Sequence, residues 1–81
     1  MGARVRMPKA LSGLLRSELE KAIYESALSR DDDLIARRYL IEKIPQIDIA
    51  AELGYERSTI SRRMPGIIKA VTKTAEKLKL T

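Results

Sequence analysis

Apolar residues recur at intervals of three and four along most of this chain, and this spacing constrains its fold more than any other feature. Over residues 11–28 and 66–80 the pattern is that of two helices, each with one buried stripe. Nowhere do apolar and polar residues alternate as in a half-buried strand. We therefore expect an all-α domain of four to five helices, with residues 1–81 forming a single unit.

The middle of the chain divides into shorter helices. The pattern predicts a second helix over about 32–43, ending at Ile44-Pro45 because the residue before proline avoids the α region. Asp31 is expected to cap this helix, with Asp32 and Asp33 in its first turn, where the helix dipole favours anions. Three consecutive carboxylates point in different directions around a helix start, so we expect capping here and no metal site.

The composition excludes several kinds of chemistry. The chain has no Cys and no His, so thiolate and imidazole chemistry are absent. A catalyst would then need carboxylates, Lys or Ser, yet Ser58 and Ser61 have no base nearby in the sequence. We expect no enzymatic activity and no cofactor. Apolar runs are only a few residues long, and the basic start lacks the apolar core of a signal peptide, so we expect a cytoplasmic protein without a membrane partner.

The net charge of +5 is unevenly placed along the chain. Residues 1–10 carry +3, residues 31–53 carry −3 and residues 54–81 carry +5, while residues 11–30 are balanced. A basic end beside an acidic middle would steer a polyanion toward that end; the alternative is that the lysines of 69–79 are simply a solvated face. The cations of the first ten residues, Arg4, Arg6 and Lys9, predict a flexible basic arm, and insertion into a minor groove is the alternative.

Residues 46–64 have the pattern of two short helices joined by a tight turn. A third helix over about 46–53 is expected to end at Gly54, whose backbone can take a positive φ. Ala50 would face the following helix, and Ile60 and Met64 would form the seam on the other side. Opposite that seam lie short polar and cationic side chains, and a helix of this diameter fits the major groove of DNA. The spacing predicts a DNA-binding helix-turn-helix, the core of a tri-helical unit.

The segment RYLIEKIPQIDIAAELGYERSTISRRM resembles the helix-turn-helix in region 4 of sigma-70-class sigma factors, and similar modules occur in phage and mobile-element regulators. The resemblance covers about residues 34–71. It implies sequence-specific binding of double-stranded DNA in transcription regulation, with RNA polymerase as a further partner. It also implies that polar residues at the start of the second helix of this motif face DNA and that Gln46 touches a phosphate. Arg63 adjoins these residues and is added to them. The candidate DNA-binding residues are therefore Gln46, Arg57, Ser58, Thr59, Ser61, Arg62 and Arg63.

The chain departs from that family in its length and at Pro65-Gly66. It is too short to hold the other sigma regions. Pro65 falls inside the expected recognition helix, where proline costs ~3 kcal/mol. We therefore predict a helix broken near Pro65, which leaves two turns to enter the groove. The helix over 66–80 would pack on the first helix and complete the core; the sharper hypothesis is that its apolar stripe is also a homodimer surface.

A second function class uses the same scaffold without DNA. The acidic segment 31–53 would then serve a protein-interaction module that binds RNA polymerase or a phage assembly or packaging partner.

Overall fold

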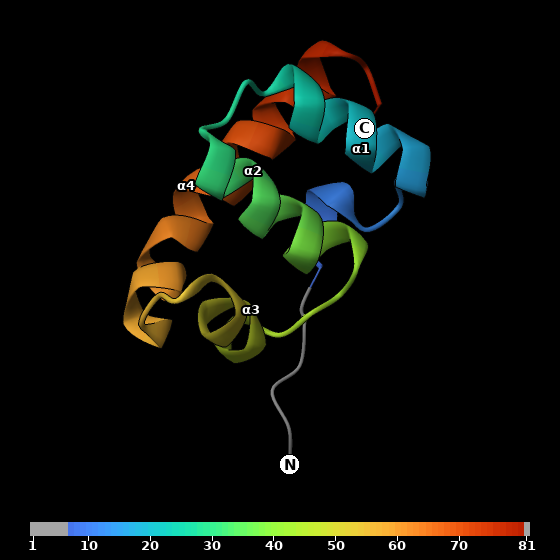
Figure 1. Ribbon diagram of the computed structural model, residues 1–81. Helices are drawn as coiled ribbons and strands as arrows, with labels where there is room; N and C mark the ends of the chain where they lie inside the picture. Colours follow the sequence, from blue (N-terminus) through green and yellow to red (C-terminus); the bar gives the residue numbers. More distant parts are fainter. Residues whose placement is uncertain (1–6, 81) are drawn as a thin grey trace.

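The computed structural model describes residues 7–80, and within that range the chain forms helices and connecting turns with no strand (Figure 1). The predicted all-α architecture is therefore confirmed. The elements in chain order are the 3₁₀ turn η1 (Lys9–Leu11), α1 (Arg16–Glu25), α2 (Arg30–Ala36), the π-helix η2 (Arg37–Ile41), α3 (Gln46–Leu53) and α4 (Arg57–Lys77).

The first helix is shorter than the predicted range 11–28. The 3₁₀ turn η1 precedes it, and regular α-helix begins only at Arg16. The Leu15 N–H donates to Glu18 Oε1 at 2.8 Å, so a side chain from the first turn satisfies the backbone at the helix start. At the other end the chain leaves the helix through Ala27, which has a φ of 51°. Leu11 lies outside α1 but is fully buried, which explains why it fits the same apolar stripe.

The second helix starts and ends differently from the prediction. The Ser29 hydroxyl, not Asp31, accepts the N–H of Asp32 and caps α2, while the three aspartates occupy its first turn. α2 then continues into η2, where the Glu42 N–H donates to the carbonyl of Arg37 five residues back. The wider turn accompanies burial of two consecutive side chains, Tyr39 and Leu40. Apolar spacing cannot distinguish such a turn from an α-helix.

The third helix and its turn match the prediction. α3 has the expected bounds and ends at Gly54, which takes the left-handed conformation with a φ of 77°. The Tyr55 N–H donates to the carbonyl of Ala50 and closes the turn.

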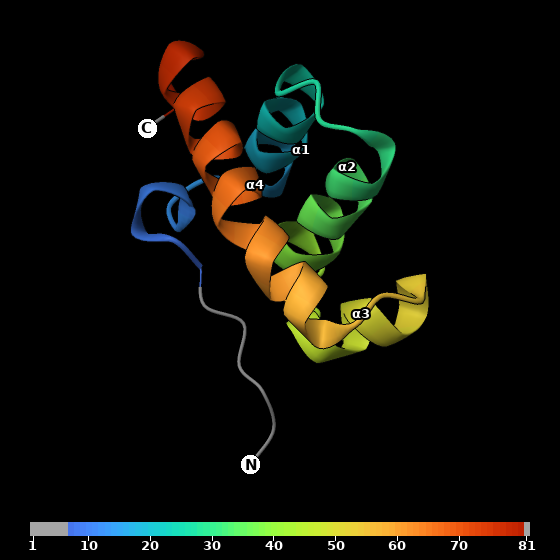
Figure 2. The ribbon, with the colours of Figure 1, turned by 90° about the vertical axis from the view of Figure 1, so that its left-hand side faces the viewer.

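The predicted break at Pro65 is wrong. α4 is one helix of 21 residues that passes through Pro65 (Figure 2). Met64 and Ile67, on either side, are 3% and 2% exposed, and burying such side chains contributes roughly 1.5–3 kcal/mol each. That gain offsets the ~3 kcal/mol cost of a proline in a helix interior. Pro65 and Ser61 are both exposed, so water can bind the Ser61 carbonyl that lacks a helical partner.

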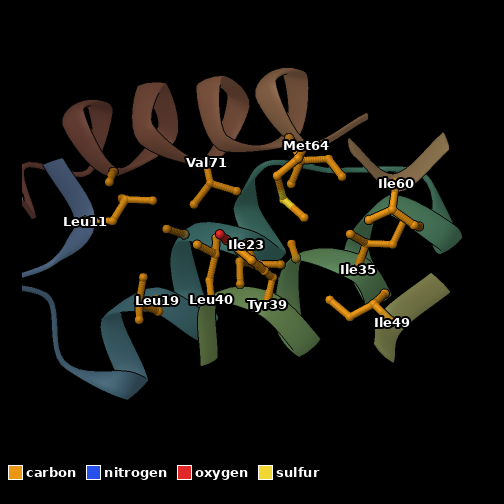
Figure 3. Close-up of a cluster of buried hydrophobic side chains, with 14 of the residues drawn as sticks. Leu11, Leu19, Ile23, Ile35, Tyr39, Leu40, Ile49, Ile60, Met64 and Val71 are labelled. Atoms are coloured by element: carbon orange, nitrogen blue, oxygen red, sulfur yellow. The ribbon is translucent and has the colours of Figure 1, made fainter. Parts of the chain in front are cut away.

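The core lies where α4 covers the other helices. α3 packs under its N-terminal half and α1 beside its C-terminal half (Figures 1 and 2). Figure 3 shows the side chains of α4 pointing toward those of α1, α2 and η2. The apolar stripe of 66–80 contributes Ile67, Val71 and Ala75 to this core, as expected for packing on the first helix. Ile68 and Leu78 of the same stripe are half-buried, and the homodimer surface stays a prediction.

Candidate nucleic-acid interface

The α3–turn–α4 unit has the dimensions of a helix-turn-helix. Three residues, Gly54, Tyr55 and Glu56, connect the eight residues of α3 to α4. Connections of three or four residues containing glycine are typical of this motif. Ile49 and Ala50 of α3 are buried against α4, whose Ile60 is fully buried. The predicted seam between the two helices is therefore present.

The first two turns of α4 present most of the candidate residues to solvent. Arg57, Ser58, Ser61 and Arg62 are exposed, and Thr59 is half-buried. Within residues 7–80, neither Arg57 nor Arg62 forms an ion pair. These side chains also lie near the positive end of the helix dipole. The arrangement can place two unpaired guanidinium groups and short hydroxyls against an anionic surface.

Arg63 differs from its neighbours because it points toward α2. Its Nη1 lies 2.9 Å from Asp32 Oδ1, and its guanidinium lies 5.2 Å from the centre of the Tyr55 ring. Arg63 follows the buried Ile60 by three residues, so it emerges at the edge of the buried face. The hydrogen bond to Asp32 raises the pKa of Arg63. Arg63 is thus joined to protein groups, in contrast to Arg57 and Arg62.

Tyr55 makes a second link between the turn and α2. Its hydroxyl donates to Asp31, which raises the pKa of Tyr55. We define Asp31, Asp32, Tyr55 and Arg63 as the turn clamp, because these residues join the start of α2 to the turn and to α4. Sequence reasoning assigned the two aspartates to capping alone. No local signal pairs them with partners 24 and 31 positions away.

Arg38 forms a similar bridge to the last turn of α3. Its Nε lies 2.9 Å from Glu52 Oε2 and its Nη1 lies 2.6 Å from Glu42 Oε2. These hydrogen bonds, led by the one to Glu52, raise the pKa of Arg38. The bridge joins η2 to α3 and places a cation beside two of the acids in the middle of the chain.

Gln46 occupies the position expected of a phosphate contact, with an acidic neighbour. It is the first residue of α3 and is half-buried. Asp48 lies exposed in the same first turn. A phosphate at this helix start would therefore meet a carboxylate as well as backbone N–H groups. The contact by Gln46 stays a prediction.

Other candidate sites are limited in the part of the chain that the structure describes. No group of three or more acidic residues is arranged to hold a metal ion between residues 7 and 80. In the same range no helix is long and apolar enough to cross a membrane. Lys9 is exposed and is the first residue of η1, whereas Arg4 and Arg6 of the basic arm lie outside the described residues.

Comparisons with known proteins found no matching family model, curated protein or solved structure.

Proposed function

We propose that this chain binds double-stranded DNA sequence-specifically and regulates transcription, as a helix-turn-helix resembling sigma factor region 4. The observation that carries the proposal is the N-terminal end of α4. Its first two turns expose Arg57 and Arg62, which have no ion-pair partner among the described residues, together with Ser58 and Ser61. This combination fits a groove whose walls are phosphates and whose floor carries hydrogen-bonding base edges.

Each side chain has a role set by its chemistry. Arg57 and Arg62 can each pair in bidentate fashion with guanine or neutralise a phosphate. The hydroxyls of Ser58 and Ser61 can donate to or accept from either kind of partner. Thr59 is half-buried and would contribute at the edge of the surface. Arg63 is assigned to the turn clamp and not to base reading.

A second candidate function is protein interaction through α3. Ile47 on α3 is 49% exposed and is the one large apolar side chain of the described α3 residues that faces solvent to this extent. It lies next to the exposed Asp48. An apolar residue beside a carboxylate suits a partner with a cationic, partly apolar surface, such as a site on RNA polymerase or on a phage assembly protein.

The test is binding-site selection from random duplexes, followed by fluorescence anisotropy with the selected duplex. The double variant Arg57→Ala/Arg62→Ala should lose roughly tenfold or more in affinity per arginine. The control Arg16→Ala/Lys21→Ala removes the same charge from exposed positions of α1 and should retain most of the affinity. Failure to enrich any sequence, or equal losses in both variants, would contradict sequence-specific reading by α4.

The variant Ile47→Ser tests the protein-interaction candidate, with Arg57→Ala/Arg62→Ala for comparison. If Ile47→Ser abolishes capture of purified RNA polymerase while Arg57→Ala/Arg62→Ala does not, the α3 face is a separate docking surface. If neither variant alters capture, α3 has no such role.

A further inference from the structure

The outward face of α4 continues beyond the proposed reading residues. α4 contains six cations and a single acid, Glu76, among its 21 residues. Arg62, Lys69 and Lys73 are all exposed and are spaced by seven and then four residues. Seven or eleven residues correspond to nearly whole numbers of helical turns, so the three side chains lie within about 40° of one another around the axis. This alignment depends on α4 passing unbroken through Pro65.

The distances along this face match the scale of a DNA groove. With a rise of 1.5 Å per residue, Lys69 and Lys73 lie ~10 and ~16 Å beyond Arg62 along the axis. The major groove is about 12 Å wide. When Arg62 meets base edges, the two lysines are therefore far enough away to meet phosphates of the flanking backbone.

The surface between these cations is free of obstruction. Pro65 and Gly66 are exposed, and a Cβ added at Gly66 would meet nothing within 4 Å. Lys69 and Lys73, with Thr72 and Glu76, line an open surface hollow. Neither lysine forms an ion pair within residues 7–80. Glu76 follows Lys73 toward the C-terminus of α4, and its negative charge would repel an anionic partner there.

From this geometry we infer that the face of α4 from Arg62 to Lys73 is one continuous DNA-binding track, in which Lys69 and Lys73 hold phosphates outside the groove that Arg57 and Arg62 read. The inference rests on the proposed DNA-binding function and adds a second group of contacts to it. Because phosphates carry no sequence information, the lysines contribute affinity and salt dependence without sequence preference.

The experiment measures affinity for the selected duplex over a range of salt concentrations. The variant Lys69→Ala/Lys73→Ala should reduce the slope of log K against log salt by about 1.8, or 0.9 for each lost phosphate contact. At 0.1 M salt it should bind roughly tenfold or more weakly. Repeating the site selection should return the wild-type sequence, whereas Arg62→Ala should return a relaxed one.

The controls separate failure of the track from failure of the function. Arg16→Ala/Lys21→Ala, the same charge change on α1, should leave the slope nearly unchanged. Suppose that the wild type and Arg57→Ala/Arg62→Ala behave as proposed, but Lys69→Ala/Lys73→Ala has the same slope of log K against log salt as the wild type. The proposed track is then wrong, while the proposal that α4 reads bases in the groove stands. If the α1 control loses as much slope, the effect is one of net charge and the track is wrong. If the wild type binds no duplex, both proposals fail.

Circular dichroism verifies that each variant is folded. A second variant, Lys69→Gln/Lys73→Gln, removes the same charges but retains long polar side chains.

Discussion

At the scale of single residues, the turn clamp gives Arg63 a different environment from Arg57 and Arg62 in the same two turns of α4. Asp32 and the Tyr55 ring hold the Arg63 guanidinium against α2, while Arg57 and Arg62 are exposed. Of these three cations within seven residues, Arg63 pairs inside the fold, and Arg57 and Arg62 are the two available for the proposed DNA contact. Arg63 is half-buried and close enough to α2 to pair with Asp32, whereas Arg62, one residue earlier, and Arg57, at the start of the helix, are exposed.

We expect Arg63→Ala to lower the melting temperature more than Arg57→Ala does. The first variant leaves Asp32 without its cation, whereas the second removes an exposed side chain without an ion pair. Thermal denaturation followed by circular dichroism measures both. Compared well below both melting temperatures, Arg63→Ala should retain more DNA affinity than Arg62→Ala; the reverse order would assign Arg63 to the DNA-binding surface.

The hydrogen bond from Tyr55 to Asp31 makes stability depend on pH at the alkaline end. The raised pKa of Tyr55 means that the folded state holds the phenolic proton more tightly than the unfolded state does. The resulting stabilisation is complete below the ordinary tyrosine pKa of about 10 and is lost as the pH rises through the higher folded value. Urea denaturation at a series of pH values should show this loss in the wild type. In Tyr55→Phe the loss should be smaller; identical profiles would exclude the bond as its source.

Two glycines give opposite predictions for the same substitution. Gly66→Ala should stabilise the protein by about 0.5–1 kcal/mol, because Gly66 lies inside α4 and an added Cβ meets nothing. Gly54→Ala should destabilise it by about 1–2 kcal/mol, because its φ of 77° is unfavourable for L-residues even though space is available. Chemical denaturation compares the two variants directly. A destabilising Gly66→Ala would indicate that α4 is not regular there.

At the scale of elements, α4 shows how tertiary packing overrides a local breaker. The helix contains a proline at its ninth residue, yet its buried face runs from Ile60 to Ala75 without interruption. The core stabilises turns on both sides of Pro65, so the chain keeps its helical path. The length of α4, ~31 Å for 21 residues, then allows one helix to serve both the turn motif and the core.

Pro65→Ala should therefore raise the free energy of unfolding, by up to about 3 kcal/mol. The substitution restores the N–H that can donate to Ser61 and removes a clash, and its exposed position leaves core packing untouched. Urea denaturation measures the gain. A loss of stability would instead mean that the proline shapes α4 to fit its neighbours.

At the scale of the whole molecule, a single core supports every helix. Its fifteen buried residues come from all six elements, and none of the described polar or charged residues is buried. The chain is small, so a domain of this size has a net stability of only about 4–12 kcal/mol. Charge is also segregated at this scale: α4 is strongly cationic, whereas the first turns of α2 and α3 contain acids. Such a distribution would orient the molecule toward a polyanion before contact.

Truncating the core should therefore remove a large share of the stability. Ile35→Ala, at a fully buried position, should cost about 2–5 kcal/mol. Tyr24→Ala, at a position that is 72% exposed, should change stability by no more than about 0.5 kcal/mol. Denaturant titration of both variants checks the difference. Similar effects would mean that α2 does not share the common core.

The sequence alone determined the features that depend on local spacing. Helical periodicity, Pro45 and Gly54 predicted the bounds of α3, the left-handed turn and the exposed positions of Arg57, Ser58, Ser61 and Arg62. These outcomes follow from backbone preferences and from which side of a helix is apolar, and both are encoded within a few residues.

Only the tertiary structure decided the rest. The unbroken α4, the π-turn at Tyr39 and Leu40, and the assignment of Arg63 to the turn clamp all depend on groups distant in sequence. In each case the free energy of burial or of pairing acts between elements and outweighs or supplements the local preference. The proposed DNA track has the same origin, because Arg62 and Lys69 are aligned only if the core keeps Pro65 within a continuous helix.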